Sequence, residues 1–275
     1  MNMQTALAPA PVDFAAEDLP LMLPGRPKAR YNLPKAWRHF KELVKDKEDT
    51  AQVTGVFEAL PWRGIYDAAL AFLATERAQQ IRRSEPTLVA ILDDHAALRR
   101  LPEGSVAHAY CDFMEREGLS AQGLVDELDK NRPAHMYWDD QVSWYFNRMR
   151  DTHDLLHVLT GFGRDALGEQ CVLAFTYSQQ PSPAHLFLGY AGGLEIRKHP
   201  VKVPVFRAVR EAQKLGKACP RLVEQPIREL LAMPLEDARA RLNISRPRFY
   251  WQAHDTWRAA GVDPYELMAP VQQAA

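Results

Sequence analysis

Hydrophobic residues recur every three or four positions along most of this chain, which is the spacing of side chains on one face of an α-helix. After Pro34, for example, Trp37, Phe40, Leu43 and Val44 form such a stripe. The alternation of hydrophobic and polar residues that marks a β-strand is almost absent. The pattern therefore predicts an all-α protein.

Capping residues and glycines set the limits of the predicted helices. Ser105 is a suitable N-cap, and Gly118 is placed to end the helix that follows. Gly161 and Gly163 interrupt the longest helical pattern. We expect further helices over residues 65–81, 138–159, 165–177, 181–196, 205–215, 226–231, 235–242 and 247–260.

The pattern favours one multi-helix domain over residues 28–265, between a flexible tail at 1–27 and a C-terminal tail at 266–275. The N-terminus lacks the features of a secretory signal or a transit peptide. No apolar run reaches the length of about 18 residues that a membrane-spanning helix needs. The apolar run at 184–194 fits either a channel for a lipid tail or an ordinary buried helix.

Composition narrows the functional classes. Lys plus Arg is 34 and Asp plus Glu is 35, so the net charge of −1 gives no electrostatic reason to expect nucleic-acid binding. The three cysteines, Cys111, Cys171 and Cys219, are far apart and are expected to be buried thiols in a reducing compartment.

The segment His153-Asp154-Leu155-Leu156-His157 carries the first candidate chemistry. On a helix, His153 and His157 are about 40° apart around the axis, so both rings point the same way, and Asp154 is within reach of the same point. Glu169 would lie about 18 Å further along an unbroken helix, too far to share an ion with His157. A turn at the glycines would return it to the histidine pair.

His153, Asp154, His157 and Glu169 thus form a candidate catalytic metal centre. Nitrogen and oxygen ligands without a thiolate suit Zn²⁺, Fe²⁺, Mn²⁺ or Co²⁺, and we expect Zn²⁺ first. Two alternatives stay open: a chance H-x-x-x-H pair, and a zinc peptidase, in which Asp154 would replace a longer glutamate base.

Other polar residues have two interpretations each. Arg148 and Arg150 precede the motif and would either bind an anionic group of a substrate or, for Arg148, form a salt bridge with Asp151 or Asp154. Four further histidines lack ligand-like neighbours, and we expect structural roles for them: His95, His108, His135 and His185.

The chain resembles a ubiquinone (coenzyme Q) biosynthesis family, the fourth of the numbered assembly proteins in yeast and human. The spacing H-D-x-x-H-x(11)-E, present here from His153 to Glu169, is a signature of that family. Two more blocks resemble it in the same order: L-P-E-G-S-V-A-H-A-Y at residues 101–110 and M-P-L-E-D-A-R-A-R-L-N-I at residues 233–244. The likeness covers roughly residues 50–250.

The resemblance implies an all-α fold with a hydrophobic tunnel for a polyprenyl lipid, and a homodimer. It implies that His153, Asp154, His157 and Glu169 are metal ligands. The implied activity is oxidative decarboxylation at ring carbon 1 of a polyprenylated hydroxybenzoate, with a role in organising the other ubiquinone-biosynthesis enzymes. Without a transit peptide, the chain is expected to be a bacterial member that acts at the inner face of the cell membrane.

Two other functions stay open. One is a non-catalytic lipid-binding scaffold that presents prenylated intermediates to partner enzymes. The other is a metal hydrolase that acts on a lipid-like ester or phosphate.

Overall fold

The computed structural model describes residues 12–45, 49–130 and 138–267. Within these ranges the chain forms helices, and its only β-type pairing is one isolated bridge between Ser105 and Pro234. The all-α prediction is therefore confirmed. The α-helices are α1 (Leu33–Lys45), α2 (Thr50–Ala59), α3 (Ile65–Leu73), α4 (Glu76–Ser84), α5 (Leu88–Leu92), α6 (His95–Leu98), α7 (Val106–Glu117), α8 (Ala121–Asp129), α9 (Gln141–Asp151), α10 (His153–Thr160), α11 (Ala166–Gln179), α12 (Pro183–Ile196), α13 (Val205–Ala218), α14 (Ile227–Ala232), α15 (Leu235–Arg241) and α16 (Arg248–Ala259).

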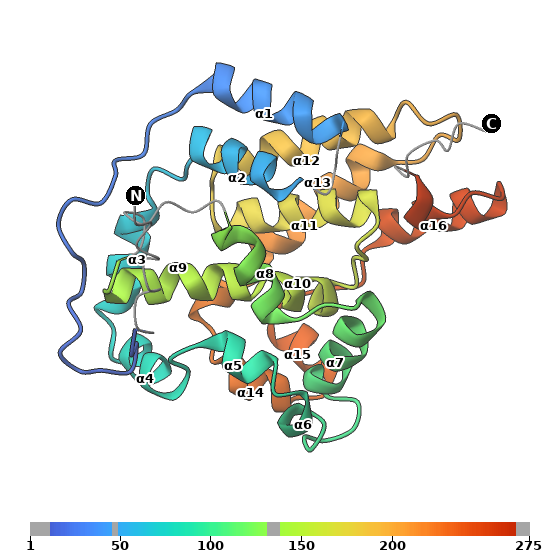
Figure 1. Cartoon of the computed structure of the whole chain (residues 1–275). Helices are drawn as coiled ribbons and strands as arrows, with labels where there is room; N and C mark the ends of the chain where they lie inside the picture. The colour runs from blue at the N-terminus through green and yellow to red at the C-terminus, as the bar shows by residue number, and fades with distance from the viewer. Residues whose placement is uncertain (1–11, 46–48, 131–137, 268–275) are drawn as a thin grey trace, which may run out of the picture.

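The helices form a layered body around α11, which packs between α12 and α13 (Figure 1). The main hydrophobic core joins α7, α10, α11, α13 and α16. A separate cluster joins α1 and α2 to α12 along one outer side of the molecule, and its buried members are Ala36, Phe40, Val56, Ala59, Leu60, Ala184 and Leu188. None of the described helices is long and apolar enough to cross a membrane.

Two predicted helices are each divided in two, and both breaks lie at a threonine. The helix expected at 65–81 ends before Thr75, whose hydroxyl group accepts the N–H group of Ala78 and caps a new helix. The helix expected at 138–159 breaks at Thr152, whose hydroxyl donates to the carbonyl of Met149 (3.1 Å). A threonine hydroxyl can form a hydrogen bond with a nearby backbone group and so compete with the helix. A single such residue hardly changes the spacing of the hydrophobic residues, so the sequence pattern did not predict either break.

The segment before α1 differs from the flexible tail that its composition suggested. Residues 1–11 lie outside the described part, but Arg82 donates hydrogen bonds to the carbonyls of Phe14 and Ala16. The Arg26 guanidinium pairs with the buried carboxylate of Asp140, which caps α9. A buried carboxylate needs a cation or several donors, and here residues 12–27 supply them.

Several smaller predictions are confirmed. Ser105 caps α7, and Gly118 ends it in the left-handed conformation. The apolar run at 184–194 lies in α12, where Ala184 and Leu188 are buried against α1 and α2 while Leu194 is 54% exposed; a lipid channel along it stays a prediction. The three cysteines are free and buried. His135 lies outside the described residues.

Candidate metal centre

Helix α10 brings the two predicted histidine ligands together. It begins at His153, so His153 and His157 lie one turn apart, and their ring centroids are separated by 5.1 Å. The ligand atoms of His153, Asp154 and His157 all lie within 4.8 Å of one another. Atoms that share one Zn²⁺ ion lie about 3–3.5 Å apart, so a small contraction would close this set around a cation.

The glycine bend returns Glu169 to the histidine pair, as predicted. Its carboxylate lies 3.7 Å from Nε2 of His157 and 4.0 Å from Nε2 of His153. Gly161 ends α10 with φ at 74°, in the left-handed region that favours glycine. Gly168 allows a close approach, since a Cβ atom there would meet the carbonyl oxygen of Gly163 at 1.9 Å.

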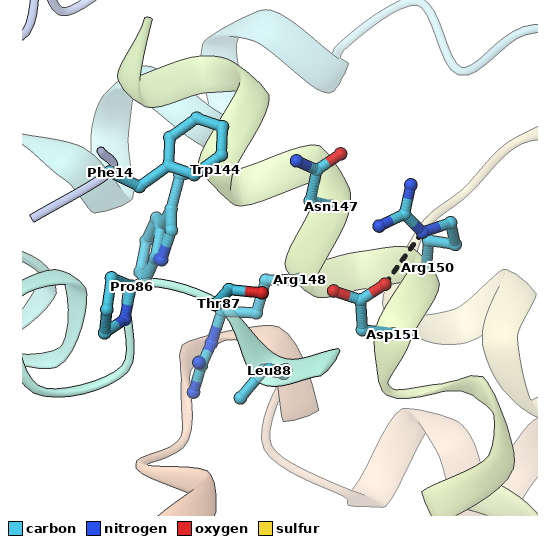
Figure 2. Close-up of a pocket in the computed structure, with 9 residues that line it drawn as sticks. All are labelled: Phe14, Pro86, Thr87, Leu88, Trp144, Asn147, Arg148, Arg150 and Asp151. Atoms are coloured by element: carbon cyan, nitrogen blue, oxygen red, sulfur yellow. Dashed lines mark hydrogen bonds and ion pairs between the residues drawn. The ribbon is translucent and has the colours of Figure 1, made fainter. Parts of the chain in front are cut away.

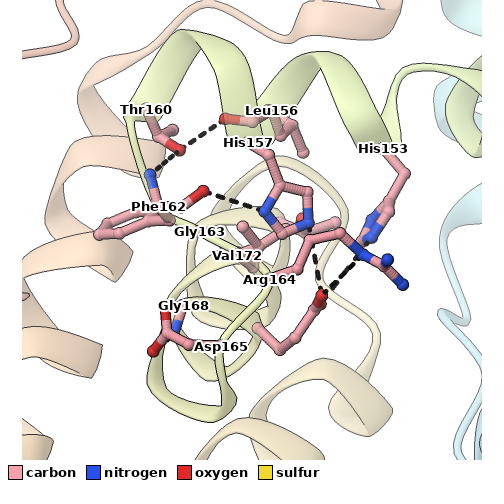
Figure 3. Close-up of polar contacts among 12 residues, drawn as sticks. His153, Leu156, His157, Thr160, Phe162, Gly163, Arg164, Asp165, Gly168 and Val172 are labelled. Atoms are coloured by element: carbon pink, nitrogen blue, oxygen red, sulfur yellow. Dashed lines mark hydrogen bonds and ion pairs between the residues drawn. The ribbon is translucent and has the colours of Figure 1, made fainter. Parts of the chain in front are cut away.

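The orientation of His157 leaves one nitrogen for a ligand. Its Nδ1 lies 3.1 Å from the carbonyl oxygen of Phe162, an acceptor that fixes the proton on Nδ1. Nε2 is therefore left with a free lone pair; it is buried, makes no hydrogen bond, and faces the Glu169 carboxylate at 3.7 Å (Figure 3). An unpaired buried nitrogen is costly, and a bound cation would remove that cost. The residues present thus fit a divalent metal.

Burial sets the ionisation of the cluster. It lowers the pKa values of both His153 and His157, so both imidazoles are neutral near pH 7. Burial is the main cause that raises the pKa of Glu169 to about 7; His153 and Arg164 oppose this rise, and the carboxylates of Asp154 and Asp165 add to it. Neutral imidazoles can bind a metal without first losing a proton, and Glu169 would release its proton when a cation binds.

Side chains of α16, which is distant in sequence, contact the bend directly and hold it in place. Asp165 caps α11 by accepting the N–H group of Gly168 (3.1 Å). The Tyr250 hydroxyl donates to the second oxygen of Asp165 (2.5 Å) and accepts the N–H group of Gly163 (2.9 Å). Nε2 of His254 lies 3.2 Å from the same carboxylate. This buried network fixes the start of the helix that carries the fourth predicted ligand, and sequence spacing gave no sign of it.

Arg148 does not have the environment expected of a residue that binds substrate. It is buried, and its guanidinium pairs with the buried carboxylate of Glu85 (2.7 Å). It also donates to the carbonyls of Val223 (2.8 Å) and Gln225. The ion-pair alternative is thus correct in kind, but the partner is Glu85 and neither of the two aspartates proposed from spacing.

Arg150 lies on the same helix and pairs with Asp151 at 2.7 Å (Figure 2). Both arginines line a cavity of about 30 Å³ between α9 and the segment from Pro86 to Leu88. That volume suits about one water molecule, not an aromatic headgroup. A role for Arg150 in binding substrate stays a prediction.

Arg164 is a site residue that the sequence interpretation missed. It follows the bend, is exposed, and its Nε lies 3.9 Å from the carboxylate of Glu169. Figure 3 shows its guanidinium beside the two histidines. Its position directly after the Gly161-x-Gly163 break was the signal that could have found it.

The comparisons with known proteins identify the family of this chain. The family model described as "Coenzyme Q (ubiquinone) biosynthesis protein Coq4" matches residues 44–248. The COQ4 homologue of Bos taurus, named as mitochondrial, is 26% identical over 168 residues, which are 61% of each chain. The Homo sapiens homologue is 25% identical over 173 residues, 63% of each chain.

Fungal and cyanobacterial proteins are similar as well. The coq4 protein of Talaromyces stipitatus is 28% identical over 204 residues, which are 73% of this chain and 67% of that protein. A solved structure described as a ubiquinone biosynthesis protein from Nostoc punctiforme has a TM-score of 0.47 and 20% identity, and covers 78% of this chain and 100% of its own. The chain spans less than two thirds of the length of the mammalian relatives. The match of the family model over well more than half of the residues establishes that this chain belongs to the Coq4 family of coenzyme Q (ubiquinone) biosynthesis proteins.

Proposed function

We propose that this protein acts in ubiquinone biosynthesis as a metal-dependent oxidative decarboxylase. It would replace the carboxylate at ring carbon 1 of a polyprenylated hydroxybenzoate with a hydroxyl group; carbon dioxide would leave, and dioxygen would take up the two electrons that the substrate loses. Membership of the family supports the pathway. The observation that supports a metal at this site is the buried Nε2 of His157, which makes no hydrogen bond and faces the carboxylate of Glu169 at 3.7 Å.

The four ligands of the proposed centre are His153, Asp154, His157 and Glu169, and Zn²⁺ is the first candidate ion, with Fe²⁺, Mn²⁺ and Co²⁺ as alternatives. When bound, the cation would supply Lewis-acid stabilisation of the negative charge that develops as carbon dioxide leaves.

The protein's own side chains would position the substrate. Arg164 is exposed beside Glu169 and would orient the substrate carboxylate through charge-assisted hydrogen bonds. The ring of His153 is 37% exposed, so the cluster opens to solvent on that side, while Phe113 stacks on His157 and closes the other. Substrate would therefore approach from the side of His153.

Purified protein supplied with prenylated hydroxybenzoate and oxygen tests this proposal. We expect conversion by the natural protein and none by Asp154→Ala or Glu169→Ala, with far-ultraviolet circular dichroism showing that both variants are folded. Equal conversion by the variants would overturn the catalytic assignment.

The second candidate function is a lipid-binding scaffold that presents prenylated intermediates to partner enzymes. It is favoured by the number of protein ligands, because four side chains can fill a tetrahedral zinc site and leave no position for a substrate. Bound lipid without conversion in the same experiment would favour this scaffold. The homodimer, the polyprenyl tunnel and attachment to the inner face of the cell membrane belong to both proposals.

A further inference from the structure

Helix α1 presents an exposed hydrophobic stripe to solvent. Leu33 is 68% exposed, Trp37 is 53% exposed and Val44 is 41% exposed. On an α-helix these three positions fall within about 40° of one another. The neighbouring face of α1, with Ala36 and Phe40, is buried against α2 and α12. The helix therefore has more apolar surface than the fold uses.

Basic side chains border this stripe. Arg38, Lys41 and Lys45 are exposed, and on the helix they lie about 80–140° from the position of Leu33. Residues 26–45 contain seven Lys or Arg residues and one acidic residue, Glu42. Arg26, Lys35 and Lys45 form ion pairs with Asp140, Glu58 and Glu42, while Arg38 and Lys41 are exposed beside the stripe. An exposed apolar stripe with cations along its edge is the pattern of helices that lie in a membrane interface.

The position of α1 leaves the stripe accessible. The helix lies along the outer edge of the molecule (Figure 1). It also precedes almost all of the segment that matches the family model, which begins at residue 44. The stripe is therefore a feature of this chain that the family match does not account for.

The basic residues beside the stripe favour an anionic lipid surface over a second copy of the chain. A symmetric pair of copies joined through α1 would bring the basic residues of both copies, including Arg38 and Lys41, to one interface, and like charges oppose such a contact. An anionic lipid surface instead attracts these groups, and long basic side chains reach phosphate groups while their stems stay on apolar surface.

We propose that α1 docks this protein on an anionic membrane surface, with Leu33, Trp37 and Val44 between the headgroups and Arg38 and Lys41 on lipid phosphates. The inference deepens the proposed function by naming the surface that would meet a membrane-dissolved, polyprenylated substrate. The docking itself does not depend on the metal centre.

Vesicle co-sedimentation with the full chain tests the docking. The vesicles contain phosphatidylcholine alone, or phosphatidylcholine with phosphatidylglycerol. We expect binding to the mixed vesicles only, weakened by added salt. Leu33→Ser with Trp37→Ser should weaken that binding by about tenfold, because it removes the apolar stripe. Trp37→Phe, which keeps an aromatic ring, should retain most of it.

Charge variants supply the matched control. Arg38→Gln with Lys41→Gln should weaken binding to the mixed vesicles. Lys214→Gln with Lys217→Gln removes the same charge from exposed positions of α13 and should leave binding unchanged. Equal losses from both pairs would show a general charge effect and overturn the proposal.

Two further results would overturn it: natural protein that ignores phosphatidylglycerol vesicles at low salt, or a stripe variant that binds them as before. A stripe variant whose only change is a smaller oligomer in solution would assign the stripe to a contact between copies. Metal content, measured on the same preparations, should be unchanged by every α1 variant. Failure of the docking and failure of the metal centre are thus separate results.

Discussion

Two clusters of metal-ligand side chains lie in the described part of this protein. They differ in whether a basic side chain of the protein already neutralises their acidic groups. The first joins His153, Asp154 and His157, with Glu169 opposite them. The second places ligand atoms of His95, Cys111 and Glu115 within the same separation.

A cation from the protein already occupies the second cluster. The Arg99 guanidinium contacts Glu115 at 2.8 Å and Asp112 at 2.7 Å, and it holds the pKa of Glu115 below its usual value. Burial raises the pKa of the Cys111 thiol, so the thiolate that a metal needs is disfavoured. In the first cluster Arg164 is more distant, at 3.9 Å, and the buried Nε2 of His157 makes no hydrogen bond. We therefore propose that the first cluster binds a cation and that the second does not, because close ligands bind a metal only where no basic side chain already neutralises them.

Among the variants that test the difference between the two clusters, removal of the His157 side chain should cause the largest loss of bound metal. We expect His157→Ala to lose nearly all of the bound metal, from about one ion per chain in the natural protein. Elemental analysis after equilibration with Zn²⁺ and gel filtration measures it. Since truncating a buried ring can also disturb the fold, Glu169→Gln, which keeps the shape of a half-buried side chain, should weaken Zn²⁺ binding as well. Unchanged metal content in both variants would rule out the centre.

Burial is the main cause of the lowered pKa of His185. Its ring packs on Phe57, with 4.7 Å between centroids, and burial lowers its pKa to about 3. In the unfolded chain histidine titrates near 6.5, so below that pH unfolding takes up a proton that the folded protein excludes. The stabilisation is present above pH 6.5 and is lost as the pH falls toward 3.

Urea unfolding of the natural protein and of His185→Gln at pH 7 and pH 5 measures this loss. Between these two pH values the natural protein should lose about 2 kcal/mol more stability than the variant, which has no imidazole to titrate. Parallel losses in the two proteins would contradict the neutral state of His185.

The geometry around the proposed metal centre was predictable wherever the signal was local. The spacing of His153 and His157, the glycine break and the start of the next helix near residue 165 lie within one short segment, and the structure arranges them as expected. The break at Thr152 escaped prediction because a single non-helical residue hardly shifts the hydrophobic period.

Partners that are distant in sequence could not be predicted from spacing. Glu85 neutralises Arg148 from 63 residues away, since 148 − 85 = 63, and Tyr250 reaches Asp165 across 85 residues. Nothing in one sequence pairs such positions, because the contact depends on how helices pack and not on the period within any of them.

Tyr250→Phe tests whether a residue that is not itself a metal ligand helps to position the ligands of the first cluster. The substitution removes the hydroxyl that joins Asp165 to Gly163 and retains the ring. We expect Zn²⁺ affinity to fall by about tenfold, as is usual when a group that orients metal ligands is lost. Competition with a chromophoric chelator measures the affinity. Tyr190→Phe, which alters a hydroxyl on α12 away from the bend, is the control and should not change it.

The smallest expected effect is at the second cluster. His95→Ala should leave the metal content and the Zn²⁺ affinity of the protein unchanged, because the Arg99 guanidinium already satisfies Glu115 and the buried Cys111 keeps its proton. The sharper variant is Arg99→Gln, which removes that cation and leaves His95, Cys111 and Glu115 in place. If an occupying charge is what separates the two clusters, Arg99→Gln should show weak additional Zn²⁺ binding, and the double variant with His95→Ala should not. If the natural protein binds two Zn²⁺ ions and His95→Ala binds one, close ligands alone are sufficient for metal binding at the second cluster, and the comparison between the clusters is wrong.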